Sequence, residues 1–267
     1  MRTIKKLLLG MLLFTFMLTT KTFAQEEQKE QFKPMFLTAT TLHWNSDSDV
    51  DFSDWLKTEQ EYFDKVTSKN DLIVGSGFYT HYYTPDNSEI ISVSVYATWE
   101  DIEKSNEVTN KLIEEGWPDE DARDAFFKKQ SSYYSDDHSD EIYATMPFTK
   151  PAQSDSTEPL LYYVRRNVRG SGGKGWWEYF DNVTMKNSFI KGYYTHRHRW
   201  GANSKDLVEV FVYDNLGDIE KSVEERDRLI NAHWPDEAKR KEFFDEYMKN
   251  FDGHGDFIYS NVPELAK

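Results

Sequence analysis

The chain contains no cysteine, so it can form no disulfide, no lipid-modified cysteine and no cysteine nucleophile. It is also poor in positive charge, because 32 Lys and Arg residues stand against 47 Asp and Glu residues and give a formal net charge of −15. Phosphate backbones and anionic lipid surfaces attract basic protein surfaces. The charge balance therefore predicts that nucleic acid is not a partner, and that the mature chain does not bind a membrane.

Long apolar runs are absent beyond the first two dozen residues. At the amino terminus, positive side chains precede an apolar run from Leu7 to Leu18, and a small-residue context ends at Ala24. This pattern is typical of a secretory signal peptide. We expect residues 1–24 to be removed near Ala24 and the mature protein to be periplasmic or secreted.

Two motifs recur at a nearly fixed spacing. Trp117-Pro118-Asp119-Glu120 returns as Trp234-Pro235-Asp236-Glu237 after 117 residues, and Thr80-His81 returns as Thr195-His196 after 115. The shorter spacing predicts about two extra residues before this strand in the first copy. Such a period indicates a duplicated structural unit. We expect a polar leader over 25–34, a first repeat over 35–149, a linker over 150–157 and a second repeat over 158–267.

Within each copy the hydrophobic period changes in the same order. Strand patterns are followed by a helical pattern, a hairpin pattern, two further helical patterns and a last strand, which gives the order βαββααβ. The proline of each Trp-Pro-Asp-Glu motif suits the start of a helix, and the acidic residues suit its positive end. We therefore expect this motif to be structural, with Trp117 and Trp234 in the core.

The order βαββααβ, present twice, resembles the ferredoxin-like unit of the dimeric α/β-barrel superfamily. That group holds cofactor-free monooxygenases, stress-responsive barrel proteins and haem-handling relatives. The resemblance implies an α+β fold of two ferredoxin-like repeats whose antiparallel sheets face each other as an intramolecular pseudo-dimeric α/β barrel. It also implies a monomer or a weak homo-oligomer. It rests on element order and duplication, since no catalytic motif is shared.

Alternation along the strand pattern at 207–213 separates an apolar row from a mixed one. We assign the valines at positions 208, 210 and 212 to the helix side. Glu209, Phe211 and Tyr213 then point into the barrel. The matching inward row of the first copy is Ser92, Ser94 and Tyr96.

The preceding strand pattern carries an unusual number of basic and aromatic residues for an acidic protein. The residues on one of its faces are Tyr194, His196, His198 and Trp200, and we expect them to face inward beside Glu209. The corresponding row of the first copy is Tyr79, His81 and Tyr83.

Three functions fit these residues. In an enzyme, His196 or His198, poised by Glu209, would remove a proton while Arg165 and Tyr79 hold a developing anion. In a metal or haem protein, the two histidines and Glu209 would supply ligands, although the longer spacing of dedicated metal sites is missing. In a binding module, an aromatic and cationic pocket would hold an anionic or sugar-like ligand.

We favour an exported small-molecule-binding protein whose pocket lies in the second repeat, without a cofactor or a dedicated metal site. A cofactor-free enzyme and a metal or haem protein remain the alternatives. The candidate catalytic residues are His196, His198 and Glu209. The candidate ligand-binding residues are His43, Tyr79, His81, Arg165, Tyr194, Trp200 and Tyr213.

One glycine-rich stretch, Gly170-Ser171-Gly172-Gly173, resembles a phosphate-binding loop only superficially, because no Gly-Lys-Ser/Thr ending follows it. We expect a flexible connection after the first strand of the second copy, able to act as a lid.

Overall fold

The computed structural model describes residues 32–47, 51–152 and 158–267. The predicted signal peptide and residues 153–157 of the predicted linker lie outside these ranges. Pro34 to Lys267 form one compact unit. Within the described residues, no helix combines the length and apolar character needed to cross a membrane.

Eight antiparallel strands form a closed barrel in the order β1-β3-β2-β8-β5-β7-β6-β4. The strands are β1 (Phe36–His43), β2 (Ile73–Tyr83), β3 (Glu89–Tyr96), β4 (Ser139–Thr145), β5 (Leu161–Arg169), β6 (Gly192–Trp200), β7 (Asp206–Tyr213) and β8 (Phe251–Asn261). The first half contributes β4-β1-β3-β2 and the second half β8-β5-β7-β6. Two seams, β2 with β8 and β4 with β6, join the halves into one sheet. The expected α+β barrel is therefore present.

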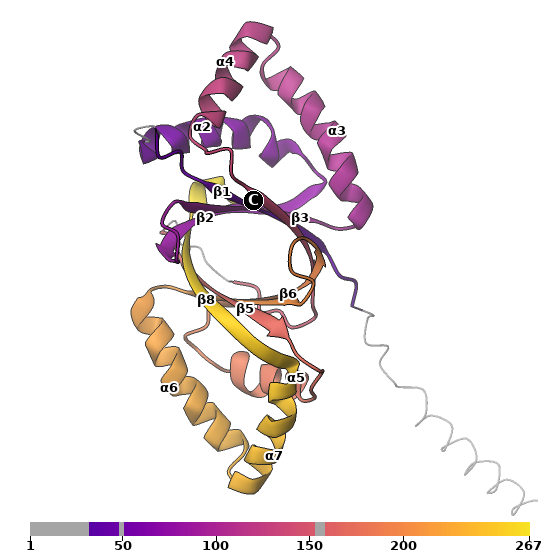
Figure 1. The fold of residues 1–267 in the computed structure, drawn as a ribbon, viewed down its shortest axis with the longest axis vertical. Coiled ribbons are helices and arrows are strands. Elements are labelled where there is room, and N and C mark those ends of the chain that lie inside the picture. Colours follow the sequence, from indigo (N-terminus) through magenta and orange to yellow (C-terminus); the bar gives the residue numbers. More distant parts are fainter. Residues whose placement is uncertain (1–31, 48–50, 153–157) are drawn as a thin grey trace, which may run out of the picture. The chain divides into compact units, whose positions relative to one another are not determined.

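Helices cover the outside of the barrel, those of the first half on one side and those of the second half on the opposite side (Figure 1). They are α2 (Phe52–Lys65), α3 (Trp99–Gly116), α4 (Glu120–Ser131), α5 (Trp176–Tyr179), α6 (Leu216–His233) and α7 (Glu237–Tyr247). Short helical turns are η1 (Thr67–Lys69), the π-helical η2 (Phe180–Thr184), η3 (Met248–Asn250) and η4 (Pro263–Leu265). The order of elements in each half is the predicted βαββααβ.

The Trp-Pro-Asp-Glu motifs open α4 and α7, as predicted. In each motif the aspartate caps the helix, because Asp119 accepts a hydrogen bond from the Ala122 amide at 2.8 Å and Asp236 accepts one from the Lys239 amide at 2.9 Å. The preceding Trp117 and Trp234 are buried. The motif thus ends one helix, anchors a tryptophan in the core and starts the next helix.

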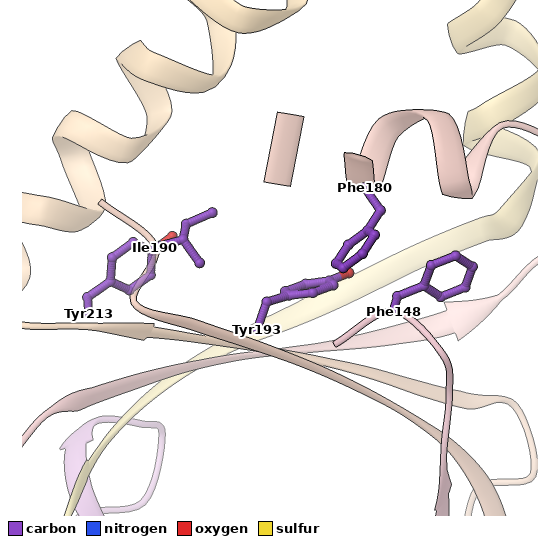
Figure 2. Close-up of a cluster of buried hydrophobic side chains, with 5 residues drawn as sticks. All are labelled: Phe148, Phe180, Ile190, Tyr193 and Tyr213. Carbon is purple, nitrogen blue, oxygen red and sulfur yellow. The ribbon is translucent and has the colours of Figure 1, made fainter. Parts of the chain in front are cut away.

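Aromatic side chains fill much of the layer between sheet and helices. Figure 2 shows one such cluster in the second half, where Phe180 of the short helix lies over Tyr193 of the sheet and Phe148 lies beside them. In the first half, Trp55 of α2 is fully buried and packs edge-on against Phe78. Burial of this apolar area stabilises the attachment of the helices to the barrel.

Strand pairing corrects the predicted alignment of the two hairpins. Tyr79 pairs with Ile91, and His196 pairs with Val208. Positions 91 and 208 are 117 residues apart, so the counterpart of His196 in the first half is Tyr79. The prediction that His81 matches His196 at a spacing of 115, with extra residues before the strand, was wrong.

Candidate functional site

Two cavities lie on opposite faces of the sheet. The helix-side cavity, about 370 Å³, lies between the strands and helices of the second half, and its lining includes Tyr163, Arg165, Tyr179, Glu209, Phe211 and Tyr247. The barrel cavity, about 380 Å³, is lined by residues of all eight strands, which places it inside the barrel. Its lining includes Tyr79, Val93, Tyr162, Tyr194, His196 and Val210. Volumes of this size suit small molecules.

Glu209 forms the polar floor of the helix-side cavity. It is 5% exposed and comes from β7, a strand in the middle of the second half's sheet. The Tyr193 hydroxyl donates to Oε1 at 2.5 Å, and the Asn167 amide nitrogen donates to Oε2 at 2.9 Å. Burial and the neighbouring Glu209 carboxylate raise the pKa of Tyr193 well above its usual value, so the phenol keeps its proton and continues to donate. These bonds compensate for burying the carboxylate and fix its orientation.

Arg165 stands beside Glu209, because the two residues pair directly between β5 and β7. Its Nη2 donates to the Tyr163 hydroxyl at 2.8 Å, and that hydroxyl donates to Asp256 at 2.7 Å. The guanidinium carbon is also 5.7 Å from the centre of the Phe211 ring. Burial is the largest single influence and opposes the charge of Arg165, but Glu209, Tyr163 and Asp256 together outweigh it and raise the pKa of Arg165. Arg165 is therefore a permanent cation in this cavity.

The remaining walls of the helix-side cavity are largely aromatic. Tyr179 of α5 and Tyr247 of α7 stack with their ring centres 4.8 Å apart. Burial raises the pKa of Tyr179 to about 12, so its hydroxyl is neutral at physiological pH. Tyr213 of β7 and Ser222 of α6 are hydrogen-bonded through their hydroxyls at 3.1 Å. The cavity thus combines aromatic faces with the buried Glu209 carboxylate and the adjacent Arg165 guanidinium.

The first half fills the corresponding region with a tryptophan. Trp55 lies in the first turn of α2, whereas the position 117 residues later is Gly172, in the loop before the much shorter α5. The loop is held in place, because Gly170 and Gly172 donate backbone hydrogen bonds to Asn250 and Lys249 of η3 at 2.8 and 3.1 Å. This anchoring does not support the expected free lid. The missing helical turn and tryptophan leave room beneath the helices of the second half.

The predicted orientation of β7 was wrong. Val208 and Val210 line the barrel cavity, whereas Glu209, Phe211 and Tyr213 line the helix-side cavity. The same reversal holds in the first half, where Ile91, Val93 and Val95 line the barrel cavity in place of the predicted row Ser92, Ser94 and Tyr96. Since His196 faces the barrel interior and Glu209 faces the helices, Glu209 does not poise either histidine as a base.

The predicted site residues divide into three groups. Tyr79, Tyr194 and His196 line the barrel cavity, and Arg165, Glu209 and Tyr213 line the helix-side cavity. The other four, His43, His81, His198 and Trp200, belong to neither lining. His43 lies 3.2 Å from Asp86, His81 bonds the Thr84 hydroxyl at 2.8 Å, His198 lies 3.3 Å from the Gly201 carbonyl, and Trp200 is 68% exposed.

The prediction missed the partners that hold Glu209 in place. Asn167 and Tyr193 each lie on the same face of the sheet as Glu209. Asn167 could have been found, because an amide in the middle of a strand buried on both faces needs a polar partner. Tyr179 and Tyr247 lie on helices. Alternation along the strands therefore could not predict that they line the cavity.

The metal or haem alternative finds little support in the side chains. Within residues 32–47, 51–152 and 158–267, no three His, Asp or Glu side chains are grouped to hold a metal ion. Of the residues lining the helix-side cavity, His254 is the one imidazole, and its Nε2 lies 3.4 Å from Asp256. In the barrel cavity His196 is the one histidine among the described residues of the lining. Each cavity thus offers a single imidazole as an axial haem ligand, and we derive no chemistry through a haem.

In sequence comparisons, no protein-family model and no curated protein matches this chain. In structure comparisons it is similar to a candidate monooxygenase from Fusobacterium nucleatum subsp. nucleatum, with TM-score 0.53 and 11% identity over 86% of this chain and 94% of that one. It is also similar to a variant of chlorite dismutase from Candidatus Nitrospira defluvii, with TM-score 0.50 and 12% identity over 86% and 93%. At sequence identities this low, the similarity shows the fold alone. The chain has the fold of the dimeric α+β barrel proteins.

Proposed function

We propose that this protein is an exported small-molecule-binding protein and that the helix-side cavity of the second half is its ligand site. The observation that carries the proposal is the buried carboxylate of Glu209, 5% exposed, beside the partly exposed Arg165 on the floor of an aromatic cavity. Burying a carboxylate is costly, and such groups are commonly arranged to meet a ligand. Export rests on the amino-terminal sequence pattern.

The chemistry of the cavity favours a hydroxylated ring, such as a sugar, over an anion. Arg165 and Arg226 are matched in the lining by Glu209 and Asp227, so the cavity has no excess of positive charge to attract an anion. Each carboxylate oxygen of Glu209 accepts one protein hydrogen bond and retains capacity for a ligand hydroxyl. The rings of Tyr179, Phe211 and Tyr247 offer flat apolar faces for the ring of the ligand.

We further propose that the chain arose by tandem duplication and acts as a monomer, with the second half specialised for binding. Equivalent contacts at the 117-residue spacing support this. Asn70 donates to the Ser105 carbonyl at 3.1 Å, and Asn187 donates to the Ser222 carbonyl at 2.9 Å. The indoles of Trp117 and Trp234 donate to the Glu61 and Glu178 carboxylates, both at 3.1 Å.

Binding can be tested by titrating the purified mature protein with neutral sugars and, separately, with sugar acids in a calorimeter. For the neutral sugar that binds most tightly, we expect Glu209→Gln and Arg165→Met each to raise Kd at least about tenfold. A tenfold rise in Kd corresponds to a loss of about 1.4 kcal/mol of binding free energy. The matched control is Ser92→Ala, the counterpart of Glu209 in the first half, which should leave Kd unchanged.

Three outcomes would overturn this assignment. They are the absence of binding by any sugar, binding that is unaffected by both cavity variants, and turnover of a bound compound. The last would replace the binding function by an enzyme, and both structural neighbours carry the names of enzymes.

A further inference from the structure

The barrel cavity is a second space with a different character. A large part of its wall is aliphatic, and the aliphatic lining residues are Leu37, Ala39, Ile91, Val93, Val95, Val164, Val208 and Val210. They come from β1, β3, β5 and β7, so the apolar surface spans both halves. Protein interiors are normally packed with few voids larger than a water molecule. A space of about 380 Å³ with such walls is far larger than a packing defect.

One buried polar atom at this wall lacks a protein partner. His196 Nδ1 has no hydrogen bond within the part of the chain that the structure describes. The other atom of this kind is Ser76 Oγ. Ser76 also borders the barrel cavity, but it pairs with Ser94, which is not part of the cavity lining. A neutral imidazole offers one donor and one acceptor, and leaving such groups unpaired when buried is unfavourable. The imidazole therefore has hydrogen-bonding capacity left for a molecule inside the barrel.

Three tyrosines line the barrel cavity together with His196. Tyr79 and Tyr162 meet edge to face with ring centres 4.7 Å apart, and the Tyr194 hydroxyl accepts a hydrogen bond from the Ala152 amide at 2.9 Å. Burial raises the pKa of Tyr79 well above its usual value and that of Tyr162 to about 12. Both phenols are therefore neutral at physiological pH, and this part of the wall carries no charge.

The charged side chains in the lining of the barrel cavity are Glu141, Arg166 and Lys267. Arg166 donates to Glu141 and lies 3.3 Å from Asp206, and it also donates to the Tyr143 hydroxyl at 2.9 Å. The Lys267 ammonium donates to the Asn70 carbonyl at 2.8 Å. One guanidinium thus serves two carboxylates, so the network of Arg166 has no excess of positive charge to attract an anionic ligand.

We propose that the barrel cavity is a second binding site, which takes an uncharged and largely apolar molecule whose single hydroxyl or carbonyl group hydrogen-bonds to His196. The aliphatic rows of β1, β3 and β7 receive the apolar body. The site lies on the opposite face of the sheet from the helix-side cavity. It goes beyond the proposed function and does not depend on it.

A pair of probes that differ by one hydroxyl tests both parts of this proposal. 4-Butylphenol and butylbenzene share the apolar body, and only the phenol can hydrogen-bond to His196. In the full mature chain we expect the phenol to bind about tenfold more tightly than the hydrocarbon, and His196→Phe to abolish this difference while hydrocarbon binding persists. Chemical shifts of the barrel methyl groups of Val93 and Val210 should move on binding.

Filling the cavity supplies an independent check. Val93→Phe, or Ala39→Leu at the position paired with it, should weaken both probes at least about tenfold, because the added carbons occupy the space of the ligand body. Ser92→Ala, on the other face of the same strand, is the control and should change neither affinity. Binding that survives both filled variants, equal affinity for the two probes in the wild-type protein, or no binding of either probe would overturn the proposal.

Discussion

His196 is a titratable side chain held at the wall of the barrel cavity. Its ring lines the barrel interior, and burial lowers its pKa to about 4 from the usual 6.5. A charged imidazole would lose its hydration inside the barrel without gaining a counter-charge. The residue is therefore a neutral hydrogen-bonding group at physiological pH.

This environment predicts a specific dependence of stability on pH. Because the folded pKa lies below the unfolded value of 6.5, the unfolded chain takes up a proton first. The contribution of neutral His196 is fully present above pH 6.5 and is lost as the pH falls from 6.5 towards 4. When the pH falls from 7.5 to 5, the loss of this contribution should lower the free energy of unfolding by about 2 kcal/mol.

Urea denaturation of the wild-type protein and of His196→Phe at both pH values measures this effect. The variant should lose about 2 kcal/mol less than the wild type over the interval, whatever its stability at pH 7.5. His138→Gln is the matched control, because the His138 side chain is 56% exposed in a turn. An equally steep pH dependence in wild type and His196→Phe would contradict the assignment.

The strand residues show what alternation can and cannot predict. Alternation correctly separated Val208 and Val210 from Glu209, because side chains on a strand alternate without exception here. It did not reveal which row faces the helices, since both faces of a barrel strand are covered. The usual expectation that the apolar row lies under the helices fails because this barrel interior is itself apolar. Glu209 and Arg165 were therefore recognised as site residues but placed on the wrong face.

At the scale of elements, the largest difference between the halves is the start of the first helix. α2 begins at Phe52 and α5 at Trp176, 124 residues later, whereas α3 and α6, and likewise α4 and α7, begin 117 residues apart. Gly172 and Gly175 of the intervening loop have φ of +97° and +86°, which favour glycine over other residues. This loop replaces the helical turn that carries Trp55 and so shapes the helix-side cavity.

The two glycines should respond differently to the same substitution. A Cβ at Gly175 would lie 2.5 Å from the Phe243 ring, whereas a Cβ at Gly172 would have no atom within 4 Å. Gly172→Ala should cost about 1 kcal/mol from the left-handed backbone alone. Gly175→Ala should cost about 1–3 kcal/mol more, because the ring of Phe243 must shift.

Gly172→Ala therefore serves as the control for backbone strain, and the difference between the two free energies of unfolding isolates the steric contact. Thermal or urea unfolding at pH 7.5 measures both. Equal losses in the two variants would show that the ring does not limit the approach of this loop.

The order of the elements was predictable because the hydrophobic period of the sequence changes between strand and helix. The register of the strands and their lengths were not predictable. The match of Thr80-His81 with Thr195-His196 favoured a spacing of 115, but backbone pairing gives 117. Identity of two residues is weak information when the adjoining turns differ. Likewise, β8 already starts at Phe251, because Gly253 and Gly255 pair with β5 in spite of their low strand propensity.

At the scale of the whole molecule, the two seams determine cooperativity. β2 pairs with β8 through positions such as His81 and Tyr259, and β4 pairs with β6 through positions such as Ala144 and Arg197. No strand within the described residues is left with an open edge, since the barrel is closed. The edge strands of each half thus pair with those of the other half. Unpaired edge strands would be available to pair with another chain.

Separating the halves should therefore change the oligomeric state before it changes the fold. We expect the intact mature chain to unfold in a single calorimetric transition whose van't Hoff and calorimetric enthalpies agree, because the seams couple the halves. Fragments 34–152 and 158–267, made separately, each expose two edge strands and should be dimeric or larger in analytical ultracentrifugation, and mixing them should restore a 1:1 complex.

The uncut chain at the same concentration is the control. A folded monomer from either fragment, or two separate transitions in the intact chain, would show that each half is stable alone and that barrel closure is not the source of its stability.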